Sequence, residues 1–224
     1  CAGDCNGDGT VAINELVLGV DIALGEEPVG ACPALMNGDG MVDIAQLIKG
    51  VNNALNGCPR PPDPTQPGPF GVGVRQITFT KPSETQPGED RMLLTDIWYP
   101  TTPDAAPLDV DLGGVINAPW APGAVNLPLL LFSHGNCSLP TLSHFFMRAL
   151  ASYGFIVAAP LHPGDLLTDP DCATADNLEL LVNRPADITF VIDSLLQLNT
   201  NPTSFFSGAI DPSRIGMSGH SYGG

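Results

Sequence analysis

Basic residues are scarce in this 224-residue sequence: 8 lysines and arginines stand against 24 aspartates and glutamates, giving a formal net charge of −16. A surface of that charge repels phosphates, so nucleic acid and anionic lipid are not expected partners. The sequence also lacks an apolar run of about 18 residues, the length that a transmembrane helix needs. With 43% hydrophobic residues, it is expected to form one sizeable core plus a small module.

A secretory signal is also missing, and the first residue is Cys1 rather than methionine. Either Cys1 is the lipid-bearing residue of a processed lipoprotein, or the chain is a piece of a longer one; we favour the second. The six cysteines are an even number, and they lie in loops rich in glycine and proline, which favours an oxidising compartment. We therefore expect a secreted, periplasmic or cell-surface protein.

Residues 1–58 contain an internal repeat with an offset of 31 residues. The tetrapeptide Asn-Gly-Asp-Gly at 6–9 returns at 37–40, and the apolar positions that follow it recur as well. Each copy is a polar loop followed by a helix, and one such unit cannot bury its apolar face alone. The apolar stripe of the first helix consists of Leu16, Val20, Ala23 and Leu24. We expect this stripe to pack on its counterpart in the second copy.

The first loop matches the twelve-residue calcium-binding pattern at positions 1, 3, 5, 6, 7 and 12. The expected ligands are the side chains of Asp4, Asn6, Asp8 and Glu15 and the carbonyl of Thr10. Gly9 supplies the sharp turn at position 6 of the pattern. Calcium takes six to eight oxygen ligands, which this spacing wraps around one point. An acidic turn without metal is the alternative, and the complete pattern favours a structural Ca²⁺ site.

The second loop has lost two carboxylates of the same pattern. Leu35 stands at position 1 and Gln46 at position 12, where aspartate and glutamate are required. The ligands that remain are Asn37, Asp39, the carbonyl of Met41, and Asp43. We expect this site to be weak or empty and the copy to be kept for packing.

The duplicated loop and helix resemble a type I dockerin module, with no helix entering either loop. The resemblance implies a small all-α unit that folds with calcium and a cohesin-like protein partner. Dockerins of cellulosomes often carry a Ser-Thr pair at loop positions 10 and 11 that recognises the cohesin. Here those positions are Ile13-Asn14 and Ile44-Ala45, which argues against cohesin binding and leaves calcium-dependent folding intact. The four cysteines of the module allow three pairings, and the sequence does not choose between them.

A proline-rich linker at 59–67, expected to be extended, separates the module from residues 68–224. There the pattern becomes that of an α/β fold with a mostly parallel sheet. Residues 101–128 predict only loops. A helix is expected to begin at Asn183, with Pro185 in its first turn, and to end near Leu198. The other expected elements are an antiparallel strand pair at 72–79 and 92–100, parallel strands at 129–132, 155–159 and 213–218, and a helix at 142–152.

The hexapeptide Gly-His-Ser-Tyr-Gly-Gly at 219–224 follows the strand at 213–218 directly. Gly-x-Ser-x-Gly after a strand is typical of a nucleophile elbow, a strained turn that raises a serine above the sheet. A glycine-rich turn without chemistry is the alternative, and the preceding strand favours Ser221 as a catalytic nucleophile. Backbone N–H groups are the best oxyanion donors because they are fixed in place before charge develops. Asn136, after the strand at 129–132, and Tyr222 are expected to supply them.

Residues 68–224 resemble bacterial α/β-hydrolases of the platelet-activating-factor acetylhydrolase and dienelactone hydrolase group. The matching motifs include Phe-Ser-His-Gly at 132–135, Arg-Pro-Ala-Asp at 184–187 and the elbow at 219–224. The resemblance implies a serine carboxylic-ester hydrolase that forms an acyl-serine intermediate on a small, lipid or polymeric ester, without a catalytic cofactor. Dienelactone hydrolase itself uses a cysteine nucleophile. Cutinase-like polyester hydrolases are more distant relatives, and they usually carry an aromatic residue where Asn136 stands.

No histidine follows Ser221, although hydrolases of this fold order their triad as Ser, Asp, His. The four histidines are His134, His144, His162 and His220. We therefore expect an incomplete α/β-hydrolase, with the triad acid and base beyond residue 224, and negligible esterase activity for the 224-residue chain alone. His134 is expected to be structural because it precedes the serine. His162 is expected on the loop surface at the active-site end of the sheet, and a place in the lining of the acyl pocket is the alternative.

Cys137 and Cys172 follow two neighbouring parallel strands. A disulfide between them would stiffen the turn that carries Asn136, and two free thiols are the alternative.

The sequence is compatible with three functions. The first is an ester hydrolase carrying a calcium-stabilised module; the second is a calcium-dependent binding or anchoring protein without catalysis; the third is a cutinase-like polyester hydrolase.

Overall fold

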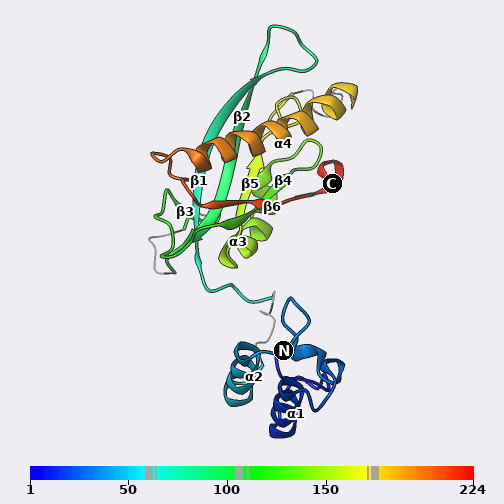
Figure 1. The fold of residues 1–224 in the computed structure, drawn as a ribbon. Coiled ribbons are helices and arrows are strands. Elements are labelled where there is room, and N and C mark those ends of the chain that lie inside the picture. Colours follow the sequence, from blue (N-terminus) through cyan, green and yellow to red (C-terminus); the bar gives the residue numbers. More distant parts are fainter. Residues whose placement is uncertain (59–62, 64, 104–107, 110, 171, 173–176) are drawn as a thin grey trace. The chain divides into compact units, whose positions relative to one another are not determined.

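The computed structural model describes residues 1–58, 63, 65–103, 108–109, 111–170, 172 and 177–224. The chain forms two compact units, Cys1–Asp63 and Pro64–Gly224 (Figure 1). Most of the linker predicted at 59–67 lies outside the described residues. Among the helices that are described, none is both long enough and apolar enough for a membrane span.

The N-terminal unit contains two helices, α1 (Ile13–Leu24) and α2 (Ile44–Asn56), each preceded by a polar loop. Short 3₁₀ turns, η1 (Val29–Ala31) and η2 (Pro33–Leu35), connect them. Of the three possible cysteine pairings, the structure has Cys1–Cys58 and Cys5–Cys32. A sulfur bonded in a disulfide cannot also carry a thioether-linked lipid. In this structure the Cys1 sulfur is bonded to Cys58 instead.

The two helices meet through glycines rather than through the predicted stripe. A Cβ atom added to Gly19 would lie 3.0 Å from Leu47 Cδ2, and one added to Gly50 would lie 3.1 Å from Leu16 Cδ2. Because neither glycine has a side chain, the backbones approach closely and the face centred on Gly19 is buried. The predicted stripe is wrong for three of its four members. Val20, Ala23 and Leu24 are exposed.

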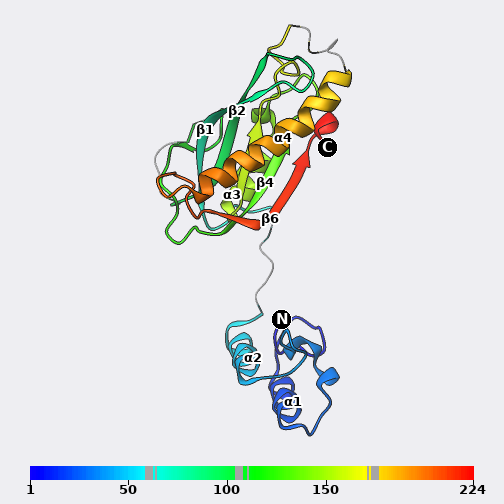
Figure 2. The same ribbon diagram turned by 45° about the horizontal axis from the view of Figure 1, so that its top comes forward.

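The larger unit is built on a six-stranded sheet with the order β3-β1-β2-β5-β4-β6. Figure 2 shows β6, drawn in red, at one edge of this sheet beside β4. Strands β4, β5 and β6 are parallel, whereas β1 and β2 form an antiparallel pair. The strands are β1 (Gly71–Pro82), β2 (Asp90–Thr101), β3 (Val115–Ile116), β4 (Leu127–Ser133), β5 (Ile156–Pro160) and β6 (Ile210–Gly219). The five longer strands confirm the sequence prediction. β3 corrects it, since this two-residue strand lies in the stretch predicted to hold only loops.

Two helices cover opposite faces of this sheet. Alternate residues of a strand point to opposite faces. Ile97, Leu129 and Ile156 therefore pack with Val191 and Leu195 of α4 (Asn177–Thr200). Their strand neighbours, including Trp98 and Val157, pack on the other face with Met147 and Ala151 of α3 (His144–Ser152). Figure 1 shows α4 lying across the sheet. The result is a helix–sheet–helix sandwich.

Helix α4 begins at Asn177, six residues before the predicted start at Asn183. The expectation that Pro185 lies in the first turn is therefore wrong, because this proline lies inside the helix. Asn183 gave a capping signal, but its side chain has another function. Its Oδ1 accepts the Glu84 N–H at 3.1 Å, and its Nδ2 donates to Thr85 Oγ1 at 2.9 Å. Asn183 therefore fastens the connection between β1 and β2 to α4.

Candidate active site

The predicted nucleophile lies on a strained turn at the end of β6. Ser221 has a φ of 53°, in the left-handed region that non-glycine residues rarely adopt, and its side chain is exposed. A Cβ atom on Gly219 would collide with the Gly223 carbonyl, and one on Gly223 would collide with the Ser133 carbonyl. Both glycines are therefore required by the close approach of backbone to backbone.

The turn that follows β4 lies against this elbow. Ser133, the last residue of β4, pairs with Gly219, and its carbonyl accepts the His220 N–H at 3.1 Å. A Cβ atom on Gly135 would lie 3.5 Å from Ser221 Cβ. The structure thus brings Ser221 and the turn at 134–137 together at one end of the sheet.

His134 orients the Gly135–Asn136 peptide within that turn. Its Nδ1–H donates to the Gly135 carbonyl at 2.8 Å, and its Nε2 accepts the His162 N–H at 3.2 Å. Burial lowers the pKa of His134 to about 3, so the ring is neutral. Because the carbonyl of that planar peptide points at His134, the Asn136 amide points away from it. That amide donates no hydrogen bond within the described part of the chain.

Cys137 ends the turn and is held on two sides. Its N–H donates to Asp165 Oδ1 at 2.8 Å, and its sulfur is bonded to Cys172. This confirms the predicted disulfide. Cys137 has a φ of 47°, a conformation that the surrounding contacts must hold in place.

A buried chain of hydrogen bonds joins a serine, a histidine and an aspartate next to the turn, and the sequence did not reveal it. Ser133 Oγ lies 3.1 Å from His162 Nε2, and His162 Nδ1 lies 3.0 Å from Asp187 Oδ2. All three residues are buried, so the prediction that His162 lies on the loop surface is wrong. Burial lowers the pKa of His162, although its hydrogen bond to Asp187 acts in the opposite direction. A neutral His162 donates from Nδ1 and accepts from Ser133.

Asp187 is the acidic residue of this chain of hydrogen bonds, and it contacts basic side chains. Arg91 donates to it from Nε at 3.0 Å and from Nη2 at 2.7 Å, and Lys81 Nζ lies 4.0 Å away. Burial by itself would raise the pKa of Asp187, but the hydrogen bonds from His162 and Arg91 outweigh burial and lower it. Asp187 is therefore ionised and His162 keeps one tautomer. Only the Arg-Pro-Ala-Asp motif at 184–187 pointed toward this network.

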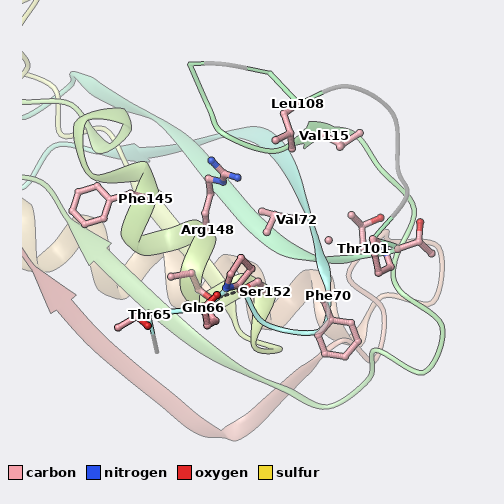
Figure 3. Close-up of a pocket in the computed structure, with 15 residues that line it drawn as sticks. Thr65, Gln66, Phe70, Val72, Thr101, Leu108, Val115, Phe145, Arg148 and Ser152 are labelled. Carbon is pink, nitrogen blue, oxygen red and sulfur yellow. Dashed lines mark hydrogen bonds between the residues drawn. The ribbon is translucent and has the colours of Figure 1, made fainter. Parts of the chain in front are cut away.

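A cavity of about 570 Å³ is lined in part by the elbow residues Tyr222, Gly223 and Gly224. Tyr222, Met217 and Ile188 form an apolar part of its wall, and Ser133 and Arg184 contribute polar atoms. A second cavity, of about 430 Å³, is lined by residues that include Phe70, Thr101, Phe145 and Arg148 (Figure 3). It lies at the opposite end of the sheet, where β1 begins and β2 ends. Of these two cavities, the larger one lies at the end of the sheet that carries the elbow.

The predicted calcium ligands of the first loop have the chemistry of calcium ligands, but their oxygens bind backbone amides. The Asp4 carboxylate accepts the N–H groups of Gly7 and Gly9, and Asp8 Oδ1 accepts the N–H and hydroxyl of Thr10. These hydrogen bonds from Thr10, with one from Asn6, lower the pKa of Asp8 and keep it charged.

The Glu15 carboxylate is buried and accepts the N–H groups of Cys5, Asn6 and Ala12. In the second loop, Asn37 Oδ1 accepts the N–H groups of Asp39 and Met41, the Met41 carbonyl accepts the Asn37 N–H, and Asp43 caps α2 through the Gln46 N–H. The described residues contain no group of three or more acidic, histidine or cysteine side chains arranged to hold a metal ion. Calcium binding at the first loop stays a prediction.

Comparisons with known proteins agree with the architecture of the larger unit. Residues 108–166 match the family model of platelet-activating factor acetylhydrolase, isoform II. Among solved structures, the ferulic acid esterase from Streptomyces cinnamoneus is 25% identical with a TM-score of 0.56, covering 69% of this chain and 53% of that chain. The chain therefore spans about half the length of that esterase. No curated protein matches the chain. The larger unit thus has an α/β-hydrolase-like fold, whereas the resemblance of residues 1–58 to a dockerin stays a prediction.

Proposed function

We propose that the larger unit belongs to a carboxylic-ester hydrolase in which Ser221 is the nucleophile. The observation that carries this proposal is the strained, exposed Ser221 lying against a turn whose Asn136 amide has no hydrogen bond among the described residues. The match to the acetylhydrolase family and the esterase neighbour support ester chemistry in general.

In the proposed reaction, Ser221 Oγ attacks the ester carbonyl and its proton passes to a general base. The carbonyl oxygen becomes an oxyanion, and the amides of Asn136 and Tyr222 stabilise it. The alcohol then leaves with a proton and the acyl group stays on Ser221, until water releases the acid. His134 and His162 do not serve as the base in this proposal, because both are buried and bonded to other groups.

The cavity beside the elbow supports an apolar acyl or aromatic group as one part of the substrate. Its volume of about 570 Å³ and the side chains of Ile188, Met217 and Tyr222 suit such a group. Because one structural neighbour is a ferulic acid esterase, methyl ferulate is a suitable test ester beside p-nitrophenyl acetate and a soluble polyester oligomer. Three disulfides support an oxidising, extracytoplasmic location.

The test is to treat the full-length protein with a fluorophosphonate probe and to map the adduct by mass spectrometry. The probe is expected on Ser221, and Ser221→Ala should remove it. Ser218→Ala, three residues earlier in β6, is the matched control and should label normally. A protein that stays unlabelled, or an adduct on Ser133 instead, would show that the proposed nucleophile is wrong.

A second candidate function is calcium-dependent protein binding by the N-terminal unit. It is favoured by two stripes of exposed aliphatic side chains at repeat-equivalent positions, 31 residues apart. They are Ile13, Val17, Val20 and Leu24 in α1, and Ile44, Ile48, Val51 and Leu55 in α2. Exposed apolar surface of this extent is typical of interaction sites. The dockerin resemblance implies a cohesin-like partner, but Ile13-Asn14 and Ile44-Ala45 stand where cohesin-binding dockerins carry a Ser-Thr pair. The partner proposed here is therefore a protein with an apolar surface.

Calcium binding is tested by thermal unfolding of the chain followed by far-UV circular dichroism, with and without calcium. We expect calcium to raise the melting temperature of the wild type but not of Asp8→Ala, which removes a first-loop ligand. Asp21→Ala, an acidic position within α1, is the matched control and should keep the shift. A wild-type protein that does not respond to calcium would contradict the metal site.

A further inference from the structure

Arg184 of helix α4 lies behind both predicted oxyanion donors. Its side chain is 6% exposed, and Nη2 donates to the His134 carbonyl and, at 2.7 Å, to Ser133 Oγ. On its other side the guanidinium lies over the ring of Tyr222, with Cζ 5.3 Å from the ring centroid. One side chain from a distant helix thus contacts the two segments that carry the Asn136 and Tyr222 amides.

Asp165 completes this arrangement from the loop after β5. One of its oxygens accepts from Arg184 Nη1, and the other accepts the Cys137 N–H at 2.8 Å. The turn is therefore held at both ends, by its first carbonyl at His134 and by its last amide at Cys137. The Gly135–Asn136 peptide lies between these two anchors.

We propose that Arg184 and Asp165 are positioning residues that fix the oxyanion hole of the hydrolase. The inference rests on the proposed function, and it assigns to this pair a task that sequence reasoning did not give it. A donor amide works only within a narrow distance of the developing oxyanion, and a shift of about 1 Å can lower the rate roughly a hundredfold. Holding the backbone on both sides of Asn136 prevents such a shift.

The chemistry of arginine suits this task better than that of lysine. The planar guanidinium presents several N–H groups in fixed directions, so one side chain can bind a carboxylate, a hydroxyl and a carbonyl together. An ammonium group on a flexible stem cannot hold the same three acceptors in one geometry. Burial lowers the pKa of Arg184, and the adjacent Asp165 carboxylate opposes that shift. Asp165 therefore helps to keep the Arg184 guanidinium protonated.

The experiment compares Arg184→Lys and Asp165→Asn with the wild type in the full-length protein. Arg214→Lys is the matched control, because Arg214 also binds a carboxylate, that of Asp211, and a backbone carbonyl, that of Asn126, far from the elbow. The measurements are kcat and KM for p-nitrophenyl acetate, affinity for phenylboronic acid, which forms a tetrahedral adduct on the serine, and the melting temperature. Amide hydrogen exchange across residues 134–138 gives a readout that does not need activity.

For Arg184→Lys we expect kcat to fall roughly 10- to 100-fold with KM within about twofold of the wild type. Affinity for the boronate should fall by the same factor as kcat/KM, and exchange in the turn should accelerate. Asp165→Asn should act in the same direction and more weakly, since asparagine can still accept the Cys137 N–H. Arg214→Lys should leave every quantity unchanged.

Two results would overturn the inference while the proposed function stands. A rise in KM at constant kcat would mean that Arg184 binds substrate from the cavity wall, and unchanged kinetics with a lower melting temperature would mean that it only stabilises the fold. If the wild type is not labelled at Ser221, the proposed function is wrong, and Arg184 then has no oxyanion hole to position. Unaltered exchange across 134–138 in Arg184→Lys would refute the anchoring of the turn independently of activity.

Discussion

Asp187→Asn removes one negative charge from the centre of the buried network while keeping the size of the side chain. In the folded protein Asp187 is completely buried and accepts two hydrogen bonds from Arg91 and one from His162. Asparagine can accept with its single oxygen, but it cannot neutralise Arg91. The Arg91 side chain is 7% exposed, so its guanidinium would then be a buried charge without its partner.

The expected loss is set by that uncompensated charge. Removing one partner of a buried ion pair typically costs about 3–5 kcal/mol, far more than an exposed pair is worth. Lys81 does not add to the penalty, because it keeps Glu84 as a partner at 2.8 Å. With a urea dependence of about 2 kcal/mol per molar, the unfolding midpoint should fall by about 1.5–2.5 M.

Tryptophan fluorescence is the appropriate assay, because both tryptophans of the chain, Trp98 and Trp120, lie in the larger unit. Urea unfolding followed in this way reports that unit without the N-terminal one. Asp193→Asn is the matched control: the same substitution on the same helix at an exposed position, where we expect a change within about 0.5 kcal/mol.

A double variant separates the charge from its packing. Arg91→Met with Asp187→Leu removes both charges together, so it should unfold at a higher urea concentration than Asp187→Asn, despite carrying two changes. The reasoning would be refuted if Asp187→Asn unfolded at the same urea concentration as Asp193→Asn. It would also be refuted if the double variant were the less stable of the two.

Three further predictions concern the same unit. Its stability should decrease as the pH falls below about 6.5, because burial lowers the pKa of His134 to about 3 and also lowers that of His162. The unfolded chain then takes up protons before the folded one, and the free energy of unfolding falls by up to about 1.4 kcal/mol per pH unit for each histidine. Urea unfolding at pH 7.5, 6 and 5 measures this, and a flat profile would contradict it. Cys172→Ser opens a disulfide with a sequence separation of 35 and should cost about 2–4 kcal/mol in the same assay, whereas an unchanged midpoint would count against a stabilising bond. Gly219→Ala would press a methyl group into the Gly223 carbonyl and should abolish fluorophosphonate labelling of the elbow, so normal labelling would disprove the close approach.

Local signals in the sequence predicted much of this architecture. The apolar runs before Ser133 and after Gly154 predicted buried parallel strands, since a strand covered on both faces has little polar alternation. The elbow was predicted because Gly219 and Gly223 follow a strand at the spacing that close packing demands. The disulfide at Cys137 was predicted from the position of two cysteines after neighbouring strands, which a parallel sheet brings to one edge.

The features that the sequence missed depend on contacts between distant segments. His162 looked like a surface residue because its loop is rich in proline, glycine and aspartate, yet Ser133 and Asp187 enclose it. Asn183 had the sequence features of a helix cap, and nothing near it in the sequence showed that its side-chain amide would bind the connection between β1 and β2. In the N-terminal unit, the buried face of α1 was predicted from the spacing of its apolar side chains. The face that is buried is centred on Gly19 instead, because a residue without a side chain lets the second helix approach closely.

The arrangement of the three disulfides bears on how the chain matures. Cys5–Cys32 is nested inside Cys1–Cys58, and Cys137–Cys172 closes much later in the sequence. Six thiols can combine in 15 ways, but the four early cysteines lie within the first 58 residues and can be paired among themselves in only three ways. Because Cys1 precedes both Cys5 and Cys32 in the chain, it can meet either of them before Cys58 is available. Oxidative folding of the N-terminal unit should therefore be accelerated by a disulfide isomerase.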